Sequence, residues 1–406
     1  MAPGAPPELD SAPPGPRVAA HDRERRWETA LRAPVRVVFF PLRLVARGVE
    51  AGVGFAGPRL FEPKPVRPSV PGPSLGPWVV ASGLDDIGIG PAIRWDGFPT
   101  GDSKLLLAAS WSTNDRRRVR FRETLGASRP VAFVLHADYD QKPNRRYYGI
   151  GNETPRADLS YFLLATTLAD ATLRLGASPL RQARIGGGFS GMSPRSGYNG
   201  SPLLADVFAP GSVPFERQAT RELWYGVAAD LASLDDARDP SRGVHGRVDA
   251  RRVSGLGASD PDFDEWRFEA RAYLPVFAKR RVIAVRAVYA GVEPRGATTT
   301  SLPFYRLTQS KGTMRFAGYY SERFRDRQLL LGRIEYRWEV LYRLSAVALY
   351  ELGEVAPRAG AFSLRHAHQS RGGGLRLGLS DVSVVRLEFA ASREGLRSVL
   401  SLDGDF

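Results

Sequence analysis

From about Trp78 to its C-terminus, the chain consists of segments in which apolar and polar side chains alternate. The clearest segment is Gln328 to Trp338. One set of alternate positions there holds Leu330, Ile334, Tyr336 and Trp338, and the other holds Leu329, Leu331, Arg333, Glu335 and Arg337. A period of two residues places successive side chains on opposite faces of a β-strand. Such a strand separates an apolar medium from a wet, charged one.

Two kinds of sheet meet that requirement: a soluble antiparallel sheet packed on its own core, and a transmembrane barrel with lipid outside and a polar lumen inside. The polar faces favour the barrel because they repeatedly carry Arg with Glu or Asp, and aromatic residues lie near the strand ends. At roughly 20 residues per strand and connection, the region from 78 to 406 holds about sixteen strands. The sequence therefore predicts an all-β fold, a transmembrane antiparallel β-barrel of about 16 strands preceded by a short N-terminal helical or irregular segment.

Three regions follow from this pattern. Residues 1–20 are rich in proline and are expected to be disordered. Residues 21–77 mix apolar residues with arginines such as Arg36, Arg43 and Arg47, which predicts an amphipathic periplasmic segment lying on a surface. Residues 78–406 form the outer-membrane barrel domain.

The composition narrows the range of functions. The chain has 57 Lys and Arg against 43 Asp and Glu, a net charge of +14. This excess fits either a polyanionic partner or an arginine-lined interior. The arginines are spread along the strands, which favours the interior, so no nucleic-acid partner is expected. There is no cysteine, no Gly-x-Ser-x-Gly elbow, and no third ligand near His366 and His368. We therefore expect no cofactor, no metal site and no enzymatic activity.

Several stretches in chain order resemble the barrel domain of the bacterial surface antigen family, the BamA/TamA-type outer-membrane proteins. Tyr147–Thr154 is similar to a segment that follows an early strand, and Leu234–Gly243 to a turn between two strands. Leu302–Tyr305 and Met314–Arg327 resemble the long sixth extracellular loop of that family. Gly372–Leu379 and Ser392–Gly395 resemble the last two hairpins.

The resemblance implies that this loop folds back into the lumen, where a loop arginine contacts a carboxylate on an inward-facing strand. Ala317 stands where the motif has its arginine, and Arg315 could serve if two residues are inserted. Charges held in a lumen of low dielectric need partners, or else the strand carboxylates simply neutralise the arginine lining. The last strand, ending at Phe406, is expected to pair with the first and remove both edges. The predicted loop residues are Arg315, Gly318, Tyr319, Arg323, Phe324, Arg325, Asp326 and Arg327, and the predicted inward carboxylates are Glu269, Glu335 and Glu388.

The resemblance also implies a function, namely outer-membrane protein assembly or protein translocation in the bacterial cell outer membrane. Family members usually recruit clients through N-terminal periplasmic repeat domains, and no such pattern is recognisable before residue 78. The alternatives are a passive anion-preferring pore or structural barrel, and a soluble β-rich binding protein. The expected partners are outer-membrane lipids including lipopolysaccharide and unfolded outer-membrane protein clients, and the barrel is expected to be a monomer.

Overall fold

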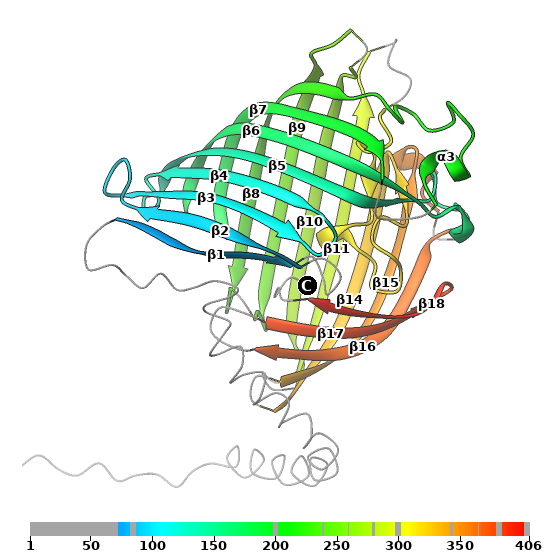
Figure 1. Ribbon diagram of the computed structural model, residues 1–406. Helices are drawn as coiled ribbons and strands as arrows, with labels where there is room; N and C mark the ends of the chain where they lie inside the picture. Colours follow the sequence, from blue (N-terminus) through cyan, green and yellow to red (C-terminus); the bar gives the residue numbers. More distant parts are fainter. Residues whose placement is uncertain are drawn as a thin grey trace, which may run out of the picture. The chain divides into compact units, whose positions relative to one another are not determined.

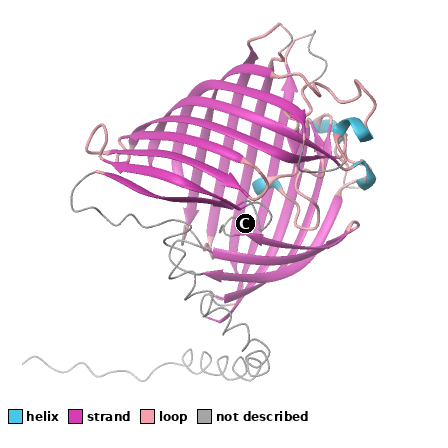
Figure 2. Ribbon diagram, viewed as in Figure 1, coloured by secondary structure: helices cyan, strands magenta, loops and turns pink. Residues whose placement is uncertain are grey.

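The structure, a computed structural model, describes residues 72–81, 87–197, 202–237, 239–258, 260–277, 281–296, 302–341, 344–363, 365–378 and 384–401. Most of this part of the chain is strand (Figure 2). Sixteen strands form one antiparallel sheet in which each strand pairs with its neighbours in sequence, and a second sheet holds only the short strands β12 and β13. The all-β fold with about sixteen strands is thus confirmed. The predicted regions 1–20 and most of 21–77 lie outside the described residues.

The strands have the following bounds. They are β1 Pro73–Ala81, β2 Ile87–Asp96, β3 Ser103–Ser112, β4 Arg117–Leu125, β5 Val131–Tyr147, β6 Ser160–Ser178, β7 Arg181–Ser196, β8 Thr220–Leu234, β9 Gly243–Gly255, β10 Phe263–Pro275, β11 Arg281–Pro294, β12 Thr308–Gln309, β13 Arg325–Asp326, β14 Gln328–Leu341, β15 Leu344–Ala356, β16 His368–Gly378, β17 Val384–Ser392 and β18 Gly395–Ser401. One short helix, α3 (Leu204–Val207), lies between β7 and β8.

The connections divide into two groups, one at each end of the strands. The long ones, which include residues 148–159, 197–219, 295–327 and 357–367, lie at one end, which we name the loop end. Connections such as 97–102, 126–130 and 235–242 lie at the other, which we name the turn end. No helix in the described part of the chain is both long and apolar enough to cross a membrane.

The two faces of the sheet have the polarity expected of a barrel in lipid. On β14 the apolar side chain of Ile334 is 50% exposed, whereas the neighbouring Glu335 is fully buried. The other residues of this strand follow the predicted alternation, with Arg333 and Arg337 buried on the inner face. A soluble sheet would instead bury its apolar face. The exposed apolar rows therefore form an outer surface that suits lipid.

Within the described residues, the first and last strands do not pair with each other. The sheet curls until β1 and β18 lie on the same side (Figure 1), but within the described residues β1 pairs only with β2 and β18 only with β17. This differs from the predicted pairing of the two edges. Phe406, the expected end of the closing strand, lies outside the described residues.

The prolines of β1 give a physical reason for the open edge. Pro77 lies opposite Pro91 of β2, and neither residue has an N–H group, so this pair exchanges no backbone hydrogen bonds. Alternate residues of β1, including Pro73 and Pro77, must therefore direct their backbone polar groups toward the free edge. Two donors are missing from that edge, which weakens any pairing with β18. β1 begins at Pro73, ahead of the start that was predicted at Trp78. The sequence does not reveal the first residues of this strand, because Pro73 and Pro77 look like strand breakers.

Candidate functional site

The candidate site is the connection between β11 and β14, whose residues 302–327 we name the inner loop. It lies on the inner side of the curved sheet, where the chain is drawn in yellow in Figure 1. Phe304, Ala317 and Phe324 are buried, which an open surface loop would not show. The short strands β12 and β13 pair through Thr308 with Asp326 and Gln309 with Arg325, and this pairing closes the loop into a stem.

Glu322 attaches the inner loop to β5. Its Oε1 atom accepts hydrogen bonds from Arg145 Nε at 3.0 Å and Arg145 Nη2 at 2.8 Å, and its Oε2 accepts one from the backbone N–H of Arg146 at 3.0 Å. Burial alone would raise the pKa of Glu322, but the positive charges of Arg145, Lys142 and Lys311 hold it well below its usual range. The carboxylate is therefore ionised and matched by a buried guanidinium, which is the condition for a buried ion pair to hold.

Arg306 attaches the start of the inner loop to β8. Its guanidinium forms an ion pair with the fully buried carboxylate of Glu222, and its Nη2 atom donates to Ser190 Oγ of β7 at 2.7 Å. Ser190 Oγ in turn donates to Glu222 Oε2 at 3.0 Å. A loop arginine thus contacts an inward-facing strand carboxylate, as the family resemblance implies, but at a position that the sequence analysis did not single out.

Arg323 connects the inner loop to two other connections at the loop end. Its Nε atom donates to Glu394 Oε1 at 2.6 Å, in the turn between β17 and β18. Its Nη1 and Nη2 atoms donate to the side chain and backbone of Thr154 at 2.7 and 2.6 Å, in the connection between β5 and β6. The guanidinium also lies over the rings of Tyr148 and Phe324. This predicted residue therefore joins two connections that lie on either side of the open edge, between β5 and β6 and between β17 and β18.

Arg325 is held by backbone oxygens and aromatic rings. It donates to the carbonyls of Phe304 at 3.0 Å and Arg146 at 3.2 Å, and its guanidinium lies 5.0 Å from the centre of the Tyr147 ring. Burial lowers the pKa of Arg325 to about 10, which still leaves it charged at neutral pH. Cation–π contacts with desolvated rings offset part of the cost of burying this charge.

Asp326 and Arg327, the next two predicted residues, lie where the inner loop joins β14. Asp326 Oδ1 accepts from the backbone N–H of Arg327 at 2.7 Å, and the side chain lines a pocket of about 530 Å³ together with Glu354 and His366. Asp326 makes no ion pair within the described residues. Arg327 lies 3.6 Å from the exposed carboxylate of Glu293.

The segment from Arg315 to Tyr319 lies against β15, β16 and β17. The backbone N–H of Ala317 donates to Glu351 Oε2 at 2.7 Å, the carbonyl of Gly318 accepts from Ser392 Oγ at 2.8 Å, and Tyr319 donates to the backbone of β16. A Cβ atom at Gly318 would lie 2.6 Å from the Cβ of Ser370, so only glycine allows this approach. The position that the family motif gives to arginine is thus held here by a backbone amide.

Phe324 completes this contact, because its ring stacks on His368 with 3.9 Å between the ring centres. The side chain of Arg315 takes no part in a hydrogen bond or ion pair within the described residues, and its backbone N–H donates to the carbonyl of Gly312. It lies near enough to Glu388 and Glu351 for their charges to act on it. The arginine that the sequence analysis offered as an alternative anchor is therefore close to the strand carboxylates but does not bind them here.

The three predicted inward carboxylates are all buried, and their ion-pair partners are arginines of the wall. Glu335 and Glu388 share Arg333 and Arg386, and Arg333 also reaches Glu351 at 2.7 Å. Glu269 pairs with three further wall arginines, Arg267, Arg271 and Arg286. Neutralisation of the arginine lining, the alternative left open by the sequence, accounts for these contacts. The ion pairs that hold the inner loop are formed by residues other than these three carboxylates.

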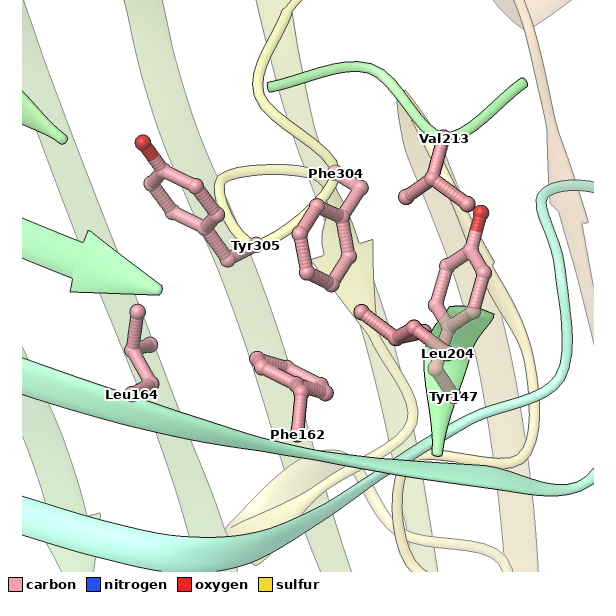
Figure 3. Close-up of a cluster of buried hydrophobic side chains, with 7 residues drawn as sticks. All are labelled: Tyr147, Phe162, Leu164, Leu204, Val213, Phe304 and Tyr305. Atoms are coloured by element: carbon pink, nitrogen blue, oxygen red, sulfur yellow. The ribbon is translucent and has the colours of Figure 1, made fainter. Parts of the chain in front are cut away.

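An apolar cluster fixes the other side of the inner loop. Figure 3 shows Phe304 and Tyr305 of the loop packed among side chains from β5, β6 and the connection between β7 and β8. The ring centres of Phe304 and Phe162 lie 4.7 Å apart in an edge-to-face arrangement. The cluster consists of Tyr147, Phe162, Leu164, Leu204, Val213, Phe304 and Tyr305.

The sequence analysis missed the four acidic residues through which the inner loop is held, one in the loop itself and three outside it: Glu322, Glu222, Glu351 and Glu394. Glu222 could have been found, because Leu223, Tyr225 and Val227 alternate outward on β8 and so place it on the inner face. Glu351 alternates in the same way on β15. Glu322 and Glu394 lie in a loop and a turn, where no period reveals the direction of a side chain.

Comparison with known proteins agrees with this architecture. The family model described as Omp85 superfamily domain matches residues 129–393. Among solved structures, BamA from Haemophilus ducreyi lacking POTRA domains 1–3 is similar with a TM-score of 0.61 and 14% identity, over 82% of this chain and 70% of that one.

CdiB from Escherichia coli and CdiB from Acinetobacter baumannii give TM-scores of 0.49 and 0.48 at 12% and 11% identity. These alignments cover 82% and 81% of this chain, and 63% and 59% of the CdiB chains. A search of curated proteins finds no match. The family match covers more than half of the sequence and includes the inner loop, and the chain therefore belongs to the Omp85 superfamily.

Proposed function

We propose that this chain assists other proteins into or across the bacterial outer membrane, and that it does so without enzymatic chemistry. In this proposal the loop end faces outward, the turn end faces the periplasm, and the exposed apolar rows contact outer-membrane lipids including lipopolysaccharide. The chain acts as a monomer on unfolded outer-membrane protein clients. Family membership and the likeness of the fold to BamA support this role.

The observation that carries the proposal is the way the inner loop is held. It is bound to β5 through Glu322, to β8 through Arg306 and to β15 through Ala317. These strands are widely separated in the order of the sheet. A segment bound at three such points crosses the lumen, which a passive pore would leave open for its solute. The edges of β1 and β18, which have no partner strand among the described residues, offer backbone groups to an incoming strand.

The proposal is tested with the full chain reconstituted in liposomes together with an unfolded outer-membrane barrel as client. Folding of the client is followed by the appearance of its heat-modifiable band. We expect faster folding than in liposomes that lack the protein, and a loss of that gain when Glu322 is replaced by glutamine. Equal rates in liposomes with and without the protein would exclude an insertion role for this client class.

The alternative, an anion-preferring pore, draws on the many arginines of the inner wall, such as Arg286, Arg333 and Arg386. Most of these charges are already matched by wall carboxylates, which lowers the electrostatic preference for anions. A steady anion-selective current that does not depend on the inner loop would favour the pore.

A further inference from the structure

A cavity of about 530 Å³ opens at the loop end, between the connection that follows β5, the last residues of the inner loop, and the connection that follows β15. We name it the acidic pocket, because Glu153, Asp326 and Glu354 line it together with His366. No lysine or arginine lines it in the described part of the chain, although the sequence holds 57 of these residues. The pocket is thus a negatively charged place in an arginine-rich protein.

Two of its carboxylates are deeply buried. Asp326 is 7% exposed and Glu354 is 6% exposed. Asp326 Oδ1 accepts a hydrogen bond from the backbone N–H of Arg327 at 2.7 Å, and Glu354 Oε2 accepts one from the backbone N–H of Ser363 at 2.9 Å. The second oxygen of each carboxylate accepts no hydrogen bond, and neither side chain forms an ion pair, within the residues that the structure describes. Each carboxylate therefore keeps one oxygen for a further donor.

Other buried carboxylates of the protein are matched. Glu222, Glu269 and Glu351 are at least as deeply buried, and each forms an ion pair with an arginine. The charge of Arg327 acts on Asp326 without forming an ion pair with it, and burial raises the pKa of Asp326. A buried charge without a matched partner is costly, so these two carboxylates favour a cation that comes from outside the described residues.

Hydrogen bonds of the backbone and of one asparagine fix the walls of the pocket. Asn152 Oδ1 accepts from the backbone N–H of Val355 at 3.1 Å, and Asn152 Nδ2 donates to the carbonyl of His366 at 2.8 Å. The backbone N–H of Gly151 donates to the carbonyl of Arg325 at 2.8 Å, next to Asp326 in the chain. The three connections are thus joined to one another, and a site held in this way binds with little ordering cost.

The size and lining of the pocket indicate an organic cation. Its volume lies within the roughly 300–1,000 Å³ of small-molecule sites, which is far more than one metal ion needs. No group of three or more His, Asp or Glu residues in the described ranges is arranged to hold a metal ion. Ile150, Pro357 and Ala361 add apolar surface, which suits the aliphatic stem of a basic side chain. A guanidinium matches carboxylates best, because its planar fork donates several hydrogen bonds in fixed directions.

We propose that the acidic pocket binds an arginine side chain of a polypeptide that reaches the loop end. Asp326 and Glu354 bind the guanidinium, and Ile150 contacts the stem. Because Asp326 belongs to β13, the bound side chain touches the stem of the inner loop. This inference goes beyond the proposed function and holds whether or not the chain inserts clients.

A matched pair of ligands tests the recognition of charge. The first is N-acetylargininamide, an arginine residue with both peptide ends capped, and the second is N-acetylcitrullinamide, which has nearly the same shape but no charge. Both are titrated by saturation-transfer NMR onto the full chain folded in a non-ionic detergent at low salt. We expect the arginine ligand to bind at least about tenfold more tightly than the citrulline ligand, because its hydrogen bonds to carboxylates are charge-assisted.

Variants of the same shape locate the site. Asp326→Asn and Glu354→Gln each remove one negative charge, and each should weaken binding of N-acetylargininamide at least about tenfold. Asp206→Asn, at an exposed carboxylate of the loop end that lies outside the pocket, should bind as wild type does. The folded band on unboiled gels shows that each variant is folded. The two ligands on wild-type protein give a result even if one variant does not fold.

Three results would overturn the proposal. The two ligands could bind wild type equally, or the arginine ligand could bind Asp326→Asn and Glu354→Gln as tightly as it binds wild type. In the third, micromolar calcium chloride would displace the arginine ligand, which would identify a metal site in place of a site for a basic side chain. The client-folding assay does not enter this test, so failure of the proposed function and failure of this inference are distinguishable.

Discussion

Replacing Glu322 by glutamine should release the inner loop from β5. The substitution keeps the shape of the side chain but removes the charge that matches Arg145, with which Glu322 forms two hydrogen bonds at 3.0 and 2.8 Å. Breaking a buried ion pair from one side costs about 3–5 kcal/mol, and glutamine, which still offers one acceptor, should fall near the lower figure. Because about 1.4 kcal/mol changes an equilibrium constant tenfold, the loop should open roughly 100 times more often.

Limited trypsin digestion measures this opening. Lys311 and Arg315 lie in the inner loop, and cleavage there follows the population of the open form when opening and closing are fast. We expect the cleavage rate to rise by about two orders of magnitude in Glu322→Gln. The folded band on unboiled gels should persist, since the strands are unchanged.

A matched control replaces an exposed partner of the same loop. Glu293 is 47% exposed and lies 3.6 Å from Arg327, so Glu293→Gln should change the cleavage rate by a few-fold at most. If Glu322→Gln and Glu293→Gln were cleaved at the same rate as wild type, the ion pair with Arg145 would not hold the loop and the reasoning would be refuted.

Three further predictions concern the same loop. Gly318→Ala should increase the rate of trypsin cleavage, because the new Cβ would lie 2.6 Å from a β16 side chain and overpacking costs about 1–3 kcal/mol. Gly360→Ala, where the new Cβ would meet open space, should leave the cleavage rate unchanged. In Arg306→Gln, the midpoint temperature for loss of the folded band on unboiled gels should fall, because the buried carboxylate of Glu222 is left without its ion-pair partner. A variant in which Arg306 and Glu222 are both replaced by methionine should recover most of this loss. The loss of hydrogen-exchange protection of residues 311–327 in Glu322→Gln, relative to wild type at the same pH, should be the same at pH 6 and pH 5. The pKa of Glu322 lies below its usual range, so its stabilising charge is lost only as the pH falls through that lowered value, and a difference between the two proteins that shrank from pH 6 to pH 5 would contradict the assignment.

The strands could be predicted from the sequence, because apolar and polar side chains alternate with a period of two residues along each strand. On β14 every predicted outward and inward residue that the structure describes lies on its expected face, from Ile334 outside to Glu335 inside. The open edge was not readable, because it depends on the register that places Pro77 opposite Pro91. A register is a relation between two strands, and the alternation within one strand does not contain it.

The contacts of the inner loop were only partly predictable. Arg323 and Phe324 could be placed in the lumen from the motif, yet their partners Glu394 and His368 come from the last three strands. The expected arginine at position 317 is replaced by a backbone amide bound to Glu351, a contact that no side-chain pattern can reveal. Loop geometry is set by long-range packing, and the sequence carries no periodic signal for it.

The inner loop as a closure of the lumen is the central claim, and single-channel conductance tests it most directly. The full chain in a planar bilayer should show little steady current. Deletion of residues 314–327, or Glu322→Gln to a lesser extent, should produce large and long-lived openings, because Ala317, Arg323 and the Glu322–Arg145 pair no longer hold the loop across the sheet. A wild-type protein that conducts steadily, with a current unchanged by the deletion, would contradict this account and favour a passive pore.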